Sequence, residues 1–268
     1  MDSRKKTAII LSISSDIAYE IASDFLKQNY LVIGTYKTTS NKIKDLKKKG
    51  AILYKLNLTN NSQINKITKK ILKLAKNWDY FVSATGTLFP ISKILNVNTF
   101  DWEQSIMINS ILQIRFLKKI LNNSRKQRRI IFFAGGGTNS AFDHYSSYTL
   151  SKIFLIKFTE LLNHEEKNLI PTIIGPGWVK TKIHNETLKS KIKNFKNKEK
   201  TKKILSEKKT ENFEKIIAFI NWTLKQPKKV VGGRNFSIKN DNWGNKRLNK
   251  ILLQDQNIYK LRRYKNDI

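Results

Sequence analysis

The chain contains no cysteine and only three histidines. Without cysteine it forms no disulfide and offers no thiolate ligand to a metal. The histidines, at positions 144, 164 and 184, are too far apart in the sequence to indicate a metal site, so no metal is expected. Apolar runs are short, none approaching the ~18 residues of a membrane span, and the run after MDSRKK is too short for a signal sequence. We therefore expect a cytoplasmic protein that has no membrane partner.

Acidic residues are scarce as well, with 20 Asp and Glu against 52 Lys and Arg, and the formal net charge is +32 at pH 7. Such an excess can attract nucleic acid. Here, however, the basic residues are spread along the chain and most are Lys, whereas Arg is the better reader of phosphates and base edges. A/T-rich codons explain the abundance of Lys, Asn and Ile equally well. A nucleic-acid partner is therefore disfavoured and kept only as a third hypothesis.

Short apolar runs alternate with amphipathic segments along the whole chain. Strands are predicted at 7–13, 30–36, 51–56, 78–84, 129–133, 169–174 and 230–238, and helices at 14–29, 40–49, 60–76, 99–122, 145–163 and 213–224. This alternation predicts one α/β domain over residues 1–268, a Rossmann-like, doubly wound parallel sheet of about seven strands with helices on both faces. The Lys-rich stretch 182–212 is expected to be a partly helical lid within it. In such a sheet, ligands bind beyond the carboxyl ends of the strands.

The stretch 129–152, RIIFFAGGGTNSAFDHYSSYTLSK, predicts a buried strand, a glycine turn and a helix that carries Tyr148 and Lys152. Residues four apart lie on one face of a helix. A lysine cation at that position stabilises a phenolate, which lowers the tyrosine pKa. Tyr148 is therefore a candidate general acid and base for alcohol–carbonyl chemistry. The spacing alone leaves open an unrelated Tyr and Lys on an ordinary helix.

Further motifs stand in a fixed order around this pair. They are Ser83-Ala84-Thr85-Gly86 after the fourth strand, Asn109 in the next helix, Tyr148-x-x-x-Lys152, Pro176-Gly177-x-Val179-x-Thr181 after the sixth strand, and Gly233-Arg234-x-x-Ser237 near the end. Together they resemble the short-chain dehydrogenase/reductase family over nearly the whole chain. The glycine run and the Pro-Gly segment also look like a subgroup linked to bacterial cell-surface polysaccharide genes.

The resemblance implies hydride transfer between a nicotinamide cofactor and a carbon–oxygen centre. Tyr148 would exchange the proton, Lys152 would lower the Tyr148 pKa and bind the nicotinamide ribose, and Asn109 would help hold a relay water. Asn109 bonding only to helix backbone, and Pro-Gly serving only as a turn, stay open. The implied cofactor contacts are Ser12, Ser14, Ser15, Ile17, Lys37, Asn57, Leu58, Ser83, Gly86, Tyr148, Lys152, Pro176, Gly177, Val179 and Thr181.

The first turn departs most from the family pattern. The family's Thr-Gly-x-x-x-Gly-x-Gly corresponds here to residues 11–18, LSISSDIA, in which Ser12, Asp16 and Ala18 replace the three glycines. Glycine there permits a tight turn and a close approach to pyrophosphate. Asp16 would repel a phosphate unless its side chain turns away to cap the helix. The hydroxyls of Ser14 and Ser15, with the helix N-terminus, could still hold phosphate.

The family's catalytic serine is also missing, because Gly135 occupies its place. Thr138, or alternatively Ser140, is expected to supply the substitute donor. Loss of one such donor typically costs ~10²–10³ in turnover. We favour a working enzyme, with a catalytically weak or inactive dinucleotide-binding scaffold or sensor as the alternative.

The second strand ends without an acid, in Lys37 and neighbouring hydroxyls, which favours NADP over NAD. The substrate is expected to be a small carbonyl or alcohol. The basic residues of the lid fit an anionic or sugar-linked compound, although a solvated charged face explains them as well. Because members of the family commonly pair through the helices that begin near residues 99 and 145, a homodimer or homotetramer is expected.

Overall fold

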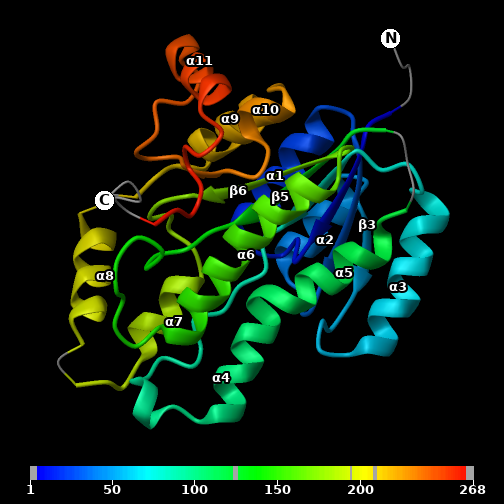
Figure 1. Cartoon of the computed structure of the whole chain (residues 1–268). Coiled ribbons are helices and arrows are strands. Elements are labelled where there is room, and N and C mark those ends of the chain that lie inside the picture. The colour runs from blue at the N-terminus through cyan, green and yellow to red at the C-terminus, as the bar shows by residue number, and fades with distance from the viewer. Residues whose placement is uncertain (1–4, 123–125, 194, 208–209, 264–268) are drawn as a thin grey trace.

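A computed structural model describes residues 5–122, 126–193, 195–207 and 210–263, and its central feature is a twisted parallel sheet (Figure 1). The strands are β1 (Thr7–Leu11), β2 (Leu31–Tyr36), β3 (Ile52–Lys55), β4 (Tyr80–Ser83), β5 (Arg128–Phe133), β6 (Leu169–Gly175) and β7 (Asn235–Ser237). They form one seven-stranded sheet in the order β3-β2-β1-β4-β5-β6-β7, and every pair is parallel. This confirms the predicted Rossmann-like α/β fold. The order reverses between β1 and β4, so the ligand crevice of such a sheet lies at the carboxyl ends of these two strands.

Helices cover both faces of the sheet. One face packs against α1 (Asp16–Lys27), α2 (Asn41–Lys48) and α9 (Phe213–Thr223). The other packs against α3 (Asn61–Leu74), α5 (Leu112–Ile120) and α6 (Ser146–Glu165). The remaining helices are α4 (Thr99–Ile106), α7 (Ile183–Lys189), α8 (Lys196–Ser206), α10 (Lys228–Val231) and α11 (Lys246–Gln254).

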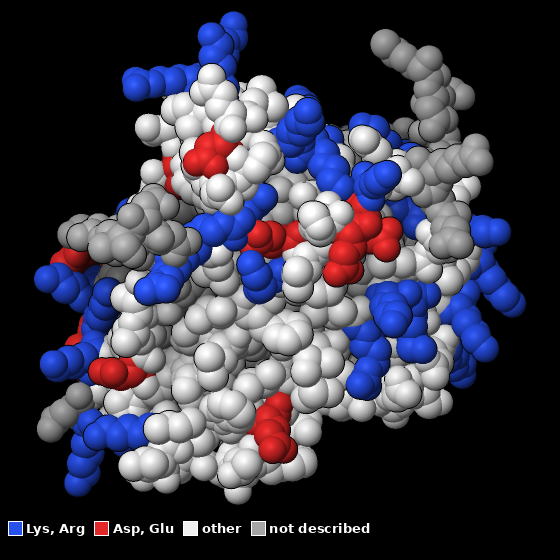
Figure 2. Space-filling view, in the orientation of Figure 1, with Lys and Arg blue, Asp and Glu red and all other residues white. Residues whose placement is uncertain are grey.

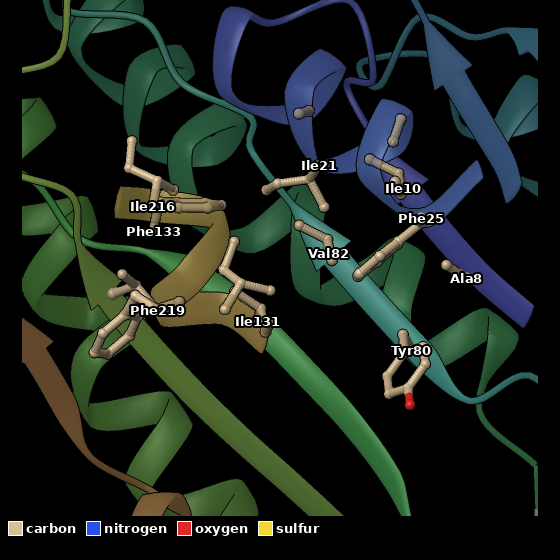
Figure 3. Packing of buried hydrophobic residues seen from close by; sticks show 14 of the residues in the cluster. Ala8, Ile10, Ile21, Phe25, Tyr80, Val82, Ile131, Phe133, Ile216 and Phe219 are labelled. Atoms are coloured by element: carbon tan, nitrogen blue, oxygen red, sulfur yellow. The ribbon is translucent and has the colours of Figure 1, made fainter. Parts of the chain in front are cut away.

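The apolar strands explain why both faces are covered. In β1, Ala8 and Ile10 contribute to one buried cluster, whereas Ile9 and Leu11 contribute to the other. This alternation follows from the two-residue period of a strand, and a parallel strand that is apolar at every position must be buried on both sides. Figure 3 shows the first cluster, in which the labelled residues are Ala8, Ile10, Ile21, Phe25, Tyr80, Val82, Ile131, Phe133, Ile216 and Phe219.

The predicted strand at 230–238 is wrong in its first half. The chain instead forms α10 up to Val231, turns through two glycines, and begins β7 only at Asn235. Gly233 has a φ of 72°, a backbone conformation that residues with a side chain rarely adopt. At Gly232, a Cβ would lie 2.1 Å from Asn163 Oδ1, so a larger residue would clash there. Val230 and Val231 are buried in α10, and a short apolar run of this kind is equally consistent with a buried helix and a buried strand.

The predicted helix at 99–122 forms, but it is not uniform. Between α4 and α5 lies a π-helical turn, η2 (Met107–Ile111), in which Asn109 and Ser110 are buried. Such turns often occur at functional sites, since the wider backbone redirects a side chain.

Arg234, directly before the last strand, holds the C-terminal part of the chain. Its guanidinium is fully buried and donates to the backbone carbonyls of Lys229, Leu252, Asp255 and Ile258. These carbonyls come from α10, α11 and the segment that follows α11, so one side chain fastens three separate pieces of backbone to the edge of the sheet.

Two of the sequence predictions reach beyond the described residues. The lid 182–212 includes residues 194, 208 and 209, and the domain 1–268 includes both chain ends, all of which lie outside the described ranges. Within those ranges the lid contains α7 and α8. In the same ranges, every helix is too short or too polar to cross a membrane.

Candidate functional site

The crevice at the strand-order reversal is built from the turns that follow β1 and β4. Ser12, in the first turn, has a φ of 59°, the left-handed conformation that glycine adopts most easily. Its hydroxyl lies 2.7 Å from the Thr85 hydroxyl in the second turn. A serine at the first glycine position thus keeps the glycine-like backbone and links the two turns.

Lys152, Asn109 and Tyr148 converge beside this crevice. Lys152 Nζ lies 3.5 Å from the Thr85 carbonyl and 5.4 Å from the centre of the Tyr148 ring. A Cβ on Gly86 would lie 3.7 Å from Asn109 Oδ1 and 3.9 Å from Lys152 Nζ. Glycine at position 86 therefore leaves room directly in front of an amide and an ammonium group. The fold thus brings Asn109 of η2 to Tyr148 and Lys152 of α6, although Asn109 lies far from that pair in the sequence.

Asn109 is held on both sides of its amide. Its Oδ1 accepts from Thr87 N–H at 2.9 Å, and its Nδ2 donates to the Thr87 carbonyl at 2.9 Å and to the Ser105 hydroxyl at 3.1 Å. The partner is thus mainly the loop after β4, not the helix backbone that the alternative interpretation proposed. Asn109 fixes the backbone of this loop next to Gly86.

The ionisation of Tyr148 and Lys152 differs from the sequence-based expectation. Burial, and to a smaller degree the nearby Glu186 carboxylate, raises the pKa of Tyr148, where the sequence predicted a lowered value. Burial lowers the pKa of Lys152 from 10.5 to about 8. The reason is the cover over both side chains, since desolvation disfavours each charged form. The protein alone therefore holds Tyr148 as a neutral phenol.

Lys152 gives a prediction for stability against pH. Its folded pKa of about 8 lies below its ordinary value of 10.5. Burying the charge therefore destabilises the fold below pH 8, and this penalty disappears as the pH rises towards 10.5. We expect the free energy of unfolding of the wild type, relative to that of Lys152→Met, to increase between pH 7.5 and pH 9.5. Urea denaturation at both pH values measures it. An equal difference at the two values would contradict the buried-cation interpretation.

Gly135, at the place of the family's serine, is the contact point of the Tyr148 hydroxyl. A Cβ on Gly135 would lie 2.3 Å from the Tyr148 hydroxyl oxygen and 2.6 Å from two ring carbons. The proposed substitutes lie further along the loop, where Thr138 is half-buried and Ser140 is exposed. Within the described residues, no hydrogen bond joins either hydroxyl to Tyr148. The structure thus does not bring Thr138 or Ser140 to the tyrosine, and the tyrosine itself fills the space that a serine would need.

An apolar cover lies over Tyr148. Tyr148 packs in a small cluster with Leu88, Tyr145 and Phe195, and Ile183 of α7 lies against the same cluster. Tyr145 Oη lies 2.7 Å from the Thr187 hydroxyl, which joins α6 to α7. The underside of the lid is apolar, although its outer side carries lysines.

Glu186 is a site residue that the sequence analysis missed. Its Oε2 accepts hydrogen bonds from the Thr87 hydroxyl at 2.9 Å and from the N–H groups of Leu88 and Phe89 at 2.7 and 3.0 Å. It therefore fastens α7 to the same loop that Asn109 holds. The sequence feature that could have pointed to Glu186 is that it is the sole acidic residue between positions 166 and 199, in a lysine-rich stretch.

The phosphate turn is ordered by its own side chains. Ser15 caps α1, its hydroxyl accepting from Ala18 N–H at 3.3 Å. Asp16 does not cap the helix. Its carboxylate pairs with Lys42 of α2, and its Oδ2 accepts from Lys182 N–H at 2.7 Å. Ser14 and Ile17 are half-buried in the same turn.

The other predicted cofactor residues lie at the expected strand ends. Lys37 is exposed after β2, and Leu58 is partly buried after β3. Asn57 Oδ1 accepts from the Thr59 N–H and hydroxyl at 3.3 and 3.0 Å. Ser83, the last residue of β4, is buried and donates to Gln113 Oε1 at 2.6 Å, so its hydroxyl is already bonded within the protein. After β6 follow Pro176, Gly177 (φ 76°), Val179 (buried) and Thr181.

Comparisons with known proteins identify the family of the chain. Residues 6–192 match the family model described as short chain dehydrogenase. The chain therefore belongs to the short-chain dehydrogenase/reductase family. No curated protein sequence matches it. The resemblance to a polysaccharide-linked subgroup is not tested and stays a prediction.

Solved structures show the same fold at low sequence identity. A short-chain dehydrogenase/reductase from Saccharomyces cerevisiae has 18% identity and a TM-score of 0.77, covering 88% of this chain and 97% of that one. Actinorhodin polyketide ketoreductase with NADPH has 18% identity and a TM-score of 0.75, covering 87% and 95%. Thermoplasma acidophilum aldohexose dehydrogenase has 15% identity and a TM-score of 0.71, covering 87% and 92%.

Proposed function

We propose that the chain is an NAD(P)-dependent oxidoreductase that interconverts a carbonyl and an alcohol, with Tyr148 as the acid and base. The observation that carries the proposal is the convergence of Tyr148, Lys152 and Asn109 beside Gly86, at the strand-order reversal of a short-chain dehydrogenase/reductase. When bound, the nicotinamide cofactor supplies or accepts the hydride. The chain's own residues hold the reactants and move the proton.

The residues at the nicotinamide end fit such a cofactor. Gly86 leaves space in front of Lys152 and Asn109. Among the residues that the structure describes, Lys152 Nζ has one hydrogen-bond partner, the Thr85 carbonyl, at the long distance of 3.5 Å. A buried ammonium with one weak partner is suited to binding ribose hydroxyls. Once a partner is bound, the Lys152 cation is stabilised, and it can then lower the Tyr148 pKa from its raised value.

At the adenosine end, the exposed Lys37 after β2 supports NADP, with NAD as the alternative. A lysine attracts the 2′-phosphate, whereas an acid at this position would bind the ribose hydroxyls of NAD. The similar ketoreductase is described with NADPH, which is consistent with this preference.

The surroundings of Tyr148 support an uncharged substrate over an anionic one. Leu88, Phe195 and Ile183 are apolar. Of the two charged groups that act on this space, Lys152 is proposed to bind the cofactor ribose, and Glu186 is an anion. The lid lysines, which suggested an anionic or sugar-linked compound, are instead mostly exposed on the outer side of α7 and α8. We propose a small apolar carbonyl or alcohol, bound beneath α7 and α8 as a lid.

The proposal is tested by titration with NADPH and NADH, followed by NADPH oxidation with a panel of aldehydes and ketones. Dinucleotide binding without turnover on any carbonyl would favour the alternative, a scaffold or sensor of the same fold. Absence of dinucleotide binding would overturn both.

We also propose that the chain forms a homo-oligomer through α4, α5 and α6. Figure 2 shows a largely uncharged surface over α4 and the adjoining parts of α5 and α6, bordered by Lys and Arg. Phe100 on α4 is 66% exposed, and Leu150, Phe154 and Leu161 lie exposed on one side of α6. In a chain of net charge +32, a bare apolar face of this kind favours a second copy as the occupant.

Replacing Leu161 by Lys is therefore expected to shift the chain from dimer to monomer, because it places two like charges at the contact between copies. Analytical ultracentrifugation measures the mass. The control is Leu253→Lys on α11, since Leu253 is 46% exposed and Leu161 47%. Equal masses for both variants and the wild type would show that α6 is not the interface.

A further inference from the structure

The strongest departure from the family pattern, Asp16, has a specific place in the structure. Its carboxylate is 12% exposed, pairs with the Lys42 ammonium, and accepts the backbone N–H of Lys182 at 2.7 Å. One oxygen thus faces α2, and the other faces the residue that precedes α7. The bond to Lys182 joins the N-terminus of α1 to the start of the lid, across 166 positions of sequence.

This contact lies across the path that a dinucleotide must take. The proposed adenosine end lies after β2 at Lys37, and the proposed nicotinamide end lies at Gly86 and Lys152, after β4 and on α6. β1 stands between β2 and β4 in the sheet. A dinucleotide that joins the two ends therefore crosses the carboxyl end of β1 and the first turn of α1, where Asp16 reaches over to Lys182.

The groups that hold Asp16 are those that an anionic pyrophosphate needs. They are an ammonium group, a backbone N–H and the positive end of the α1 helix dipole. A carboxylate and a phosphate cannot use them together, because two anions at one place repel.

From these contacts we infer that Asp16 is an internal competitor of the cofactor's pyrophosphate. The inference rests on the proposed dinucleotide function. Binding of the dinucleotide displaces the carboxylate, and it thereby breaks the Asp16–Lys182 bond that holds the start of α7. Cofactor affinity and the position of the lid are thus coupled through one side chain.

Two variants separate the charge of Asp16 from its contact. Asp16→Asn keeps an acceptor for Lys182 N–H but removes the negative charge, and Asp16→Ala removes both. We expect both variants to bind NADPH about tenfold more tightly than the wild type, which corresponds to about 1.4 kcal/mol. The matched control is Glu20→Gln, which removes one charge from the next turn of α1. NADPH fluorescence titration gives the dissociation constants, and thermal unfolding verifies that each variant is folded.

A second measurement follows the lid without any cofactor. Hydrogen–deuterium exchange over residues 178–190 is expected to be faster in Asp16→Ala than in the wild type, and unchanged in Asp16→Asn and Glu20→Gln. If NADPH bound the wild type and both Asp16 variants with equal constants, the competition would be refuted and the proposed function would stand. Unchanged exchange in Asp16→Ala would refute the link to the lid. No binding of NADPH or NADH to any variant would overturn the proposed function as well.

Discussion

Tyr148→Phe is expected to reduce NADPH-dependent carbonyl reduction by about 10²–10⁴-fold, the usual contribution of one positioned acid. The substitution removes only the hydroxyl, and the phenyl ring still fills the apolar cluster of Leu88, Tyr145 and Phe195. We therefore expect the dissociation constant of NADPH to stay within a few-fold of the wild type while kcat falls. Steady-state kinetics on any carbonyl that the wild type reduces measures both parameters.

Tyr145→Phe is the matched control for this experiment. Tyr145 lies one helical turn before Tyr148 in the same cluster, and its hydroxyl bonds to Thr187, not to a group in the crevice. Removing that hydroxyl is expected to change kcat only a few-fold. A Tyr148→Phe variant that retains the wild-type kcat would end the proposed mechanism.

Gly135→Ser is expected to lower activity by about 10²-fold, although it returns the residue that the family carries at this place. A Cβ here would lie 2.3 Å from the Tyr148 hydroxyl, far inside any real contact, so the tyrosine must move by about an ångström. Displacements of that size at a reacting group typically cost ~10² in rate. The same kinetic assay measures the effect, together with a crystal structure of the variant to locate the Tyr148 ring.

Two further glycine variants separate the steric effect from the hydroxyl. Gly135→Ala introduces the same Cβ without an oxygen and should be as damaging as Gly135→Ser. Gly136→Ala is the control, since the nearest atom to its Cβ would be 3.8 Å away on Phe142. A gain in kcat for Gly135→Ser but not for Gly135→Ala would mean that the chain has simply lost a serine, and that Tyr148 needs it.

The sheet could be predicted from sequence because most of its strands contain a continuous apolar run. The apolar runs 8–11 in β1 and 130–133 in β5 are continuous, and the existence and order of these strands were predicted correctly. The strand prediction failed where an apolar pair suits a buried helix as well as a buried strand, as at Val230 and Val231. The helix α11 was not predicted, because it buries one residue, Leu252, and its Lys and Arg residues obscure the apolar pattern in the sequence.

Of the candidate site, only the residues that belong to recognisable sequence motifs could be predicted. Tyr148, Lys152 and Asn109 were found by spacing and resemblance, and the fold brings them together. The pKa directions were not predictable, because they follow from the cover that the lid provides. The contact between Gly135 and Tyr148 depends on tertiary packing that no local pattern encodes.

The hydrogen bonds from Arg234 to the backbone beyond β7 have a consequence for synthesis of the chain on the ribosome. Its carbonyl partners include Leu252, Asp255 and Ile258, which are translated after it. Until those residues have left the exit tunnel, an unpaired guanidinium would be buried at the growing edge of the sheet, which is strongly unfavourable. The nascent domain therefore completes its seventh strand only after the residues up to Ile258 have emerged, and a chain that ends before them would keep that edge open.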